Sequence, residues 1–123
     1  MSKSYKELQV YRISFDLFVD THRFSMRLPK YERFELGSQL RRSADSVNSN
    51  IVEGYGRRFY KKDFIKFLIY SVASNDETIN HLQKITVIYP NLSDEARQLI
   101  NRYTVLGKQL YRFVEFVRLK WKS

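Results

Sequence analysis

The 123-residue sequence contains no cysteine, four glycines, two prolines and two histidines. Without cysteine, disulfides, thiolate metal sites and cysteine nucleophiles are excluded, and a reducing compartment is favoured. So few glycines and prolines argue against an all-β fold, because such folds need many tight turns. The longest apolar stretch, around Phe67 to Ala73, is interrupted by Ser71 and is too short to span a bilayer. The first residues show no apolar signal segment, so we expect a cytoplasmic protein with no membrane partner.

Acidic residues are also scarce relative to basic ones: 13 Asp and Glu face 22 Lys and Arg, a formal net charge of +9. On a chain that fits a single domain, 1–123, this excess favours a polyanionic partner such as RNA, DNA or an acidic protein surface. The alternative, that the charge serves solubility alone, stays open.

Apolar residues recur every three or four positions along four segments, which predicts four amphipathic helices. We place them at about 4–28, 32–55, 60–88 and 93–120. Pro29, Gly54 and Pro90 mark helix ends, and Ser93 is a natural N-cap for the last segment. Short connections force neighbouring helices to run antiparallel. The expected fold is all-α, an up-down-up-down antiparallel four-helix bundle.

The same spacing predicts which side of each helix is buried. In the first segment, the expected buried face consists of Leu8, Tyr11, Phe15, Phe18 and Ser25. In the fourth, it consists of Ala96, Leu99, Tyr103, Leu106, Leu110, Phe113, Val117 and Trp121.

The second segment carries a polar line beside its apolar stripe. The apolar stripe is Leu36, Leu40, Ala44, Val47 and Ile51, and one position earlier along the helix run Gln39, Ser46, Asn50 and Glu53. Polar side chains at the edge of a buried face need hydrogen-bond partners. We expect a structural network inside the bundle that reaches Ser74 and Glu77 of the third segment. A subunit interface is the alternative.

Four further residues bear on this line. Arg41 and Arg42 lie between core positions and are expected to clamp Glu53, Asp45 or a neighbouring subunit. In the third segment, small residues thin out the apolar face, and we expect Asn75 or Asp76 to reach the polar line of the second.

Two clusters of basic residues are candidate nucleic-acid sites. Between the second and third segments lie Arg57, Arg58, Lys61 and Lys62, with Phe59 and Tyr60 between them. Cations hold phosphates while rings stack on bases, so this mixture suits a nucleic-acid strand. The alternative is a solvated turn whose rings cover the bundle end. The tail has Arg112, Arg118, Lys120 and Lys122 around Trp121, and is expected either to hold RNA or to fray.

The sequence gives little support for a catalytic site or a metal-binding site. A di-metal bundle site needs several carboxylates and paired Glu-x-x-His motifs, whereas this chain has only His22 and His81, far apart in sequence. Gly54 and Gly56 lack the strand and lysine of a phosphate-binding loop, and no histidine base accompanies Ser46 in its segment. We therefore expect no enzyme, no cofactor and no catalytic or metal-binding residue.

The second segment resembles a family. It reads Gln-Leu-Arg-Arg, then Ser-Val, then Asn-Ile-x-Glu-Gly, with an arginine after the glycine. The matching positions are Gln39, Leu40, Arg41, Arg42, Ser46, Val47, Asn50, Ile51, Glu53, Gly54 and Arg57. This pattern is similar to that of the four-helix-bundle proteins encoded in intervening sequences of bacterial 23S ribosomal RNA genes. The resemblance covers all four segments and is specific in the second, while Ala73, Asn75 and Thr78 depart from the pattern of the third.

The resemblance implies a homopentamer without known enzymatic activity. Related proteins, the accessory variability determinants of diversity-generating retroelements, are similar bundles that bind a reverse transcriptase and nucleic acid through a basic surface. The leading hypothesis is a non-enzymatic oligomer that binds RNA or a ribonucleoprotein. The alternatives are the retroelement accessory role and a scaffold that binds only proteins.

Overall fold

The computed structural model describes residues 4–122. Within this range the chain forms four α-helices and no strand. They are α1 (Gln9–Ser25), α2 (Leu36–Gly56), α3 (Lys61–Ile88) and α4 (Ser93–Lys120). Short 3-10 helices precede three of them: η1 (Tyr5–Glu7), η2 (Lys30–Phe34) and η3 (Pro90–Leu92). The predicted all-α class with four helices is confirmed.

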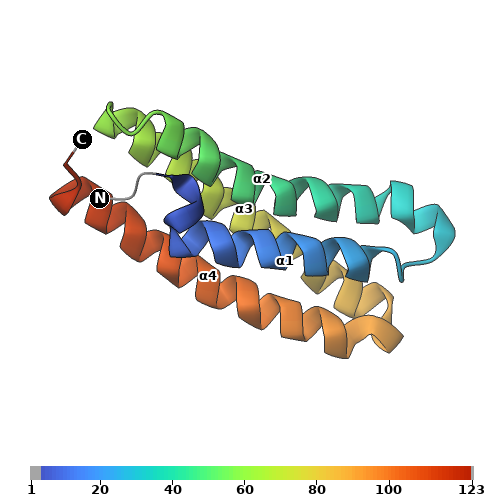
Figure 1. Ribbon diagram of the computed structural model, residues 1–123. Coiled ribbons are helices and arrows are strands. Elements are labelled where there is room, and N and C mark those ends of the chain that lie inside the picture. The colour runs from blue at the N-terminus through green and yellow to red at the C-terminus, as the bar shows by residue number, and fades with distance from the viewer. Residues whose placement is uncertain (1–3, 123) are drawn as a thin grey trace.

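The four helices lie side by side along one long axis, and each reverses the direction of the one before (Figure 1). Helix α3 packs on α2 and on α4, and α1 packs on the same two helices. Both described ends of the chain therefore lie at one end of the molecule, next to the α2–α3 turn (Figure 1). None of these helices combines the length and apolarity needed to cross a bilayer, as judged over residues 4–122.

The first two helices are shorter than predicted because the chain is extended or turns at their ends. Leu8 has extended backbone dihedrals (φ −72°, ψ 129°) and separates η1 from α1. At Glu35 (φ −107°, ψ −98°) the chain breaks again between η2 and α2. At the start of α4, Ser93 already has helical dihedrals and makes no cap, because η3 leads directly into this helix.

The buried face of α1 differs from the predicted one. Phe15 is 48% exposed, and the positions that point inward include Ser14, Leu17 and Thr21. Small hydroxyl residues occupy this face because their polar atoms are bonded inside the bundle: Ser14 Oγ donates to Tyr11 O at 2.9 Å. Assigning Phe15 to the core was therefore wrong, whereas Leu8 and Ser25 are buried as expected.

The apolar stripe of α4 forms much of the core. Of the eight predicted positions, seven are buried and Phe113 is half-buried. The Tyr103 ring is 1% exposed, and its hydroxyl lies 2.6 Å from Thr21 Oγ1 of α1. The hydroxyl group thus links two helices that lie at opposite ends of the chain.

Helices α3 and α4 approach each other closely at Gly107. A Cβ atom at this position would lie 3.0 Å from Asn75 Nδ2. That amide donates to the Tyr103 carbonyl oxygen at 2.9 Å. Asn75 therefore faces α4, and Asp76 is exposed, so the expectation that one of them reaches the polar line of α2 was wrong. The physical reason is that the Asn75 amide satisfies a main-chain carbonyl of the neighbouring helix.

Replacing Tyr103 by phenylalanine should destabilise the fold in a pH-dependent way. Burial raises the pKa of Tyr103 to about 12, so the neutral phenol is favoured in the folded state. Below pH 10, Tyr103→Phe should lower the free energy of unfolding by about 1–3 kcal/mol, because Thr21 loses its partner. The wild-type protein loses its advantage as the pH rises from about 10 towards 12.

Urea unfolding of both proteins across this pH range measures the effect. Tyr111→Phe is the matched control, since Tyr111 is 66% exposed and makes no hydrogen bond within residues 4–122. A difference between wild type and Tyr103→Phe that stays constant up to pH 12 would contradict the assignment.

Candidate functional site

Cations from η1, α1, the α2–α3 turn, α3 and α4 lie at the end of the bundle that holds this turn and the last turns of α4. Figure 1 shows how these segments come together at that end. We call this surface the basic end. Its cations are Lys6, Arg12, Arg57, Arg58, Lys61, Lys62, Lys66, Arg112, Arg118, Lys120 and Lys122. The carboxylates at the same level of the bundle are fewer: Glu7, Asp16, Glu53, Asp63 and Glu115.

The two arginines of the α2–α3 turn are held by neighbouring groups. Arg57 lies 3.9 Å from Glu53 and 3.8 Å from Asp63, and its guanidinium stacks 4.8 Å from the Phe67 ring centre. Arg58 lies over the Tyr55 ring at 4.2 Å and donates to the Tyr55 carbonyl at 3.2 Å. Both arginines therefore stabilise the turn and contribute positive electrostatic potential. Their guanidinium groups already interact with carboxylates, rings or a carbonyl of the same chain.

The turn and the C-terminal tail, which were predicted as separate clusters, form one surface. Lys61 Nζ donates to the Arg118 carbonyl oxygen at 3.5 Å. The Trp121 ring is buried and packs edge-on against Tyr55 at 6.3 Å and Phe64 at 5.1 Å. Of the two expectations for the tail, fraying does not apply up to Trp121, because this side chain anchors it in the core.

Several groups of the basic end are available to a partner. Lys62, Arg112, Lys120 and Lys122 are exposed and make no hydrogen bond or ion pair within the described part of the chain. By contrast, Arg118 is bonded to Glu115 at 2.7 Å, and this hydrogen bond lowers the pKa of the Glu115 carboxyl. Phe59 and Tyr60 are 65% and 73% exposed, so they present rings beside these cations.

The polar line of α2 is only partly a network. Ser46 Oγ lies 2.8 Å from Ser74 Oγ of α3, and Asn50 Nδ2 donates to both Ser46 Oγ and Ser46 O at 2.9 Å. These three half-buried residues connect α2 and α3 within one bundle. Gln39 and Glu53 are exposed, and Glu77 lies 3.6 Å from His81 of its own helix.

Sequence reasoning missed two buried hydrogen bonds in the same interface. Ser71 Oγ donates to the Val47 carbonyl oxygen at 2.6 Å, and Thr78 Oγ1 donates to Ser43 Oγ at 2.9 Å. A signal for them exists in the sequence, because Ser71, Ser74 and Thr78 follow at intervals of three and four.

Neither arginine of the Gln-Leu-Arg-Arg motif in α2 is paired with Glu53 or Asp45 within residues 4–122. Arg41 donates to Ser25 Oγ at 2.9 Å and to the Arg33 carbonyl oxygen at 2.7 Å. It therefore holds the connection between α1 and α2 and clamps neither Glu53 nor Asp45. The reason is that helical geometry points this side chain towards carbonyl and hydroxyl acceptors of the preceding turn.

Arg42 is exposed and lines an open polar pocket of about 300 Å³ between α2 and α3, together with Gln39, Ser43, Ser46, Glu77 and His81. The Nδ1 atom of His81 is buried and has no hydrogen-bond partner among residues 4–122. Across residues 4–122, no group of three or more His, Asp or Glu side chains is arranged to hold a metal ion.

A family model described as the 23S rRNA-intervening sequence protein matches residues 6–112, which include parts of all four helices. The chain belongs to this family. The resemblance inferred from the α2 motif is thereby confirmed. None of the curated protein sequences compared with the chain matches it.

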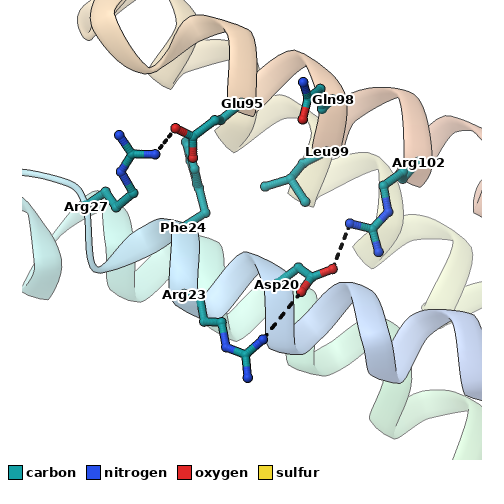
Figure 2. A pocket seen from close by; sticks show the side chains of 8 residues that line it. All are labelled: Asp20, Arg23, Phe24, Arg27, Glu95, Gln98, Leu99 and Arg102. Atoms are coloured by element: carbon teal, nitrogen blue, oxygen red, sulfur yellow. Dashed lines mark hydrogen bonds and ion pairs between the residues drawn. The ribbon is translucent and has the colours of Figure 1, made fainter.

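This member of the 23S rRNA-intervening sequence protein family also has a pocket of about 250 Å³ between α1 and α4, remote from the basic end (Figure 2). Its charges are paired. Arg102 Nη1 donates to Asp20 at 2.8 Å, Arg23 lies 4.0 Å from the same carboxylate, and Arg27 pairs with Glu95. As Figure 2 shows, these ion pairs run along and across the two helices. Because each arginine faces a carboxylate, we assign this pocket to helix packing and not to an anionic partner.

Removing the hydroxyl at the centre of the α2–α3 network should destabilise the bundle. Ser46→Ala leaves Ser74 Oγ and the Asn50 amide with fewer partners, so we expect the free energy of unfolding to fall by about 1 kcal/mol. Ser49→Ala is the matched control on the same helix, because Ser49 is exposed and bonds only to Asp45. Urea unfolding at neutral pH gives both values, and equal losses would contradict a role for the network.

Proposed function

We propose that this 23S rRNA-intervening sequence protein is a non-enzymatic, cytoplasmic oligomer that binds RNA through the basic end. The observation that carries the proposal is the convergence of cations from the N-terminal region, the α2–α3 turn and the end of α4 on one surface. Phosphate contacts by Lys and Arg release counterions, and they supply most of the affinity of proteins that bind RNA without strong sequence preference.

The distribution of engaged and unengaged charges supports the choice of this end. Lys62, Arg112 and Lys120 have no partner within residues 4–122, so they can contact phosphates without breaking an existing ion pair. The exposed rings of Phe59 and Tyr60 lie next to Lys62 in the chain and suit stacking on unpaired bases. The charged pocket between α1 and α4 has its own carboxylates and offers a polyanion no comparable excess.

A binding role is favoured over catalysis by the state of the hydroxyl groups in the interior. The hydroxyls of Ser71 and Thr78 donate to acceptors of α2, and those of Ser46 and Ser74 bond to each other. Each of these hydroxyls therefore takes part in helix packing, and none of the four is left as an unengaged nucleophile.

For the assembly we propose a homopentamer, which would repeat the basic end around a ring and so raise its affinity for a long strand. Exposed apolar side chains offer area for such contacts along the outer surface of α3 and α4. Ile69 is 50% exposed, Val105 55% and Tyr111 66%.

Neutralising the unengaged lysines of the basic end should weaken RNA binding and its dependence on salt. The variant Lys62→Gln/Lys120→Gln removes two cations, so the slope of log affinity against log salt for an unstructured RNA should become shallower by roughly 1.4. The control is Lys30→Gln/Lys84→Gln, which removes equal charge from exposed positions near the opposite end of the bundle. Fluorescence anisotropy at several salt concentrations measures the slope of each protein.

An unchanged slope in the first variant, or no RNA binding by the wild-type protein even at low salt, would contradict the proposal. In that case the exposed apolar side chains of α3 and α4 would favour a scaffold that binds only proteins.

The assembly is tested separately by mass. Light scattering coupled to size exclusion should give five times the chain mass of 14.8 kDa at micromolar concentration. Tyr111→Glu, which places a charge on the proposed contact surface, should shift the protein towards smaller species. A wild-type protein with the mass of one chain at all concentrations would exclude the pentamer.

A further inference from the structure

A groove of about 440 Å³ lies beside the basic end, between the start of α1 and the last turns of α4. Its lining residues come from two segments: Glu7, Leu8, Gln9 and Val10 on one side and Gln109, Arg112, Phe113 and Phe116 on the other. The volume falls in the range of small-ligand sites. Apolar side chains and rings, together with a few polar groups, make this groove chemically different from the charged pocket between α1 and α4.

One polar atom in the wall of the groove lacks a partner. Gln109 Oε1 is buried and accepts no hydrogen bond within the described chain. A buried acceptor without a donor is costly, so a bound molecule that supplies a donor to Gln109 would gain a favourable hydrogen bond. The N–H groups on the edges of nucleobases are donors of this kind.

Phe116 offers a ring for stacking. Its side chain is 39% exposed. It lies parallel to Phe113, with ring centres 6.2 Å apart and an interplanar angle of 13°. Phe113 is held in turn by edge-on contacts with Phe64 at 5.9 Å and Trp121 at 6.3 Å. The Phe116 ring is therefore backed by fixed rings, which reduces the entropy that it loses when a base stacks on it.

The charged side chains at the edge of the groove determine the orientation in which an RNA strand can bind. Arg112 is exposed and has no partner within residues 4–122, and it precedes Phe116 by four positions, so both lie on the same side of α4. Gln109 precedes Arg112 by three positions and shares this side. Glu7 stands on the opposite wall and repels phosphate. A phosphate group is thus favoured next to Arg112, with the attached base directed into the groove.

We propose that this groove holds one unstacked nucleobase of a bound RNA strand, with the base on Phe116, its edge bonded to Gln109 and the adjoining phosphate on Arg112. This inference rests on the proposed function and adds to it a site for a single base. Charge complementarity with the basic end is the argument for a nucleotide as the occupant.

The test compares two fluorescent strands of equal length, an oligoadenylate and an abasic strand with the same phosphates. We expect Phe116→Ala to weaken binding of the oligoadenylate about tenfold, because stacking on one ring is lost, and to leave the abasic strand unchanged. Phe116→Tyr keeps a ring and should restore binding. Phe34→Ala is the matched control, since this ring of η2 is 77% exposed and lies outside the groove lining.

Gln109→Leu provides a second variant that keeps the side-chain size and removes the unpartnered acceptor, so its thermal stability should not fall. It should weaken the oligoadenylate alone by several-fold. If Phe116→Ala and Gln109→Leu affect both strands equally, or neither strand, the base site is overturned while RNA binding by the basic end stands. If the wild-type protein binds neither strand at low salt, the proposed function and the base site are overturned together.

Discussion

A row of hydroxyl side chains runs along the contact between α2 and α3, and the position of the basic end depends on it. Ser71 bonds to the Val47 carbonyl, Thr78 to Ser43, and Ser46 to Ser74, so each hydroxyl found in this row has a partner. Short side chains of this kind let two helices approach while satisfying polar atoms that would otherwise be costly to bury. Near the α2–α3 turn, a Cβ atom on Gly54 would lie 3.1 Å from Phe67 Cβ. The end of α2 and the start of α3 are therefore also in close contact. The tight turn that follows carries Arg57 to Tyr60 out at the end of the bundle.

The basic side chains of the molecule fall into two groups. Those that face a carboxylate contribute to helix packing, and we assign those of the basic end that do not to binding. Between α1 and α4 the arginines face Asp20 and Glu95, and exposed pairs of this type add little to stability while neutralising the surface. At the basic end Arg57 and Arg118 are paired, whereas Lys62, Arg112 and Lys120 have no carboxylate partner in the described range 4–122. The unpaired cations of the basic end therefore share their surface with the exposed rings of Phe59 and Tyr60.

The sequence was a good guide where burial follows from regular apolar spacing. The stripe of α4 was predicted residue by residue, because every position in it is apolar or aromatic. On α1 the same reasoning assigned Phe15 to the core, because an aromatic residue at helical spacing is a stronger sign of burial than Ser14 or Thr21. What makes Thr21 a core residue is a hydroxyl partner, Tyr103, that lies 82 positions away in the sequence. Such pairing cannot be read from local periodicity.

In the candidate site, too, some features could be predicted from the sequence and others could not. Both basic clusters were found from composition, and their union follows from the antiparallel order of the helices. The direction of the Arg41 side chain and the unpartnered Gln109 Oε1 depend on side-chain geometry in three dimensions, so the sequence could not predict them.

The position of Trp121 in the core has a consequence for synthesis on the ribosome. Translation proceeds from the N-terminus, so α2 and α3 are both available to pair while most of α4 is still being made. The Tyr55 and Phe64 rings at their joined ends lack one edge-on neighbour until residue 121 has left the exit tunnel, since Trp121 packs against both. The aromatic cluster beneath the cationic surface is thus completed last. During synthesis, the Tyr55 and Phe64 rings are therefore more accessible than in the folded protein. A chaperone or a second copy of the chain can contact these rings before Trp121 packs against them.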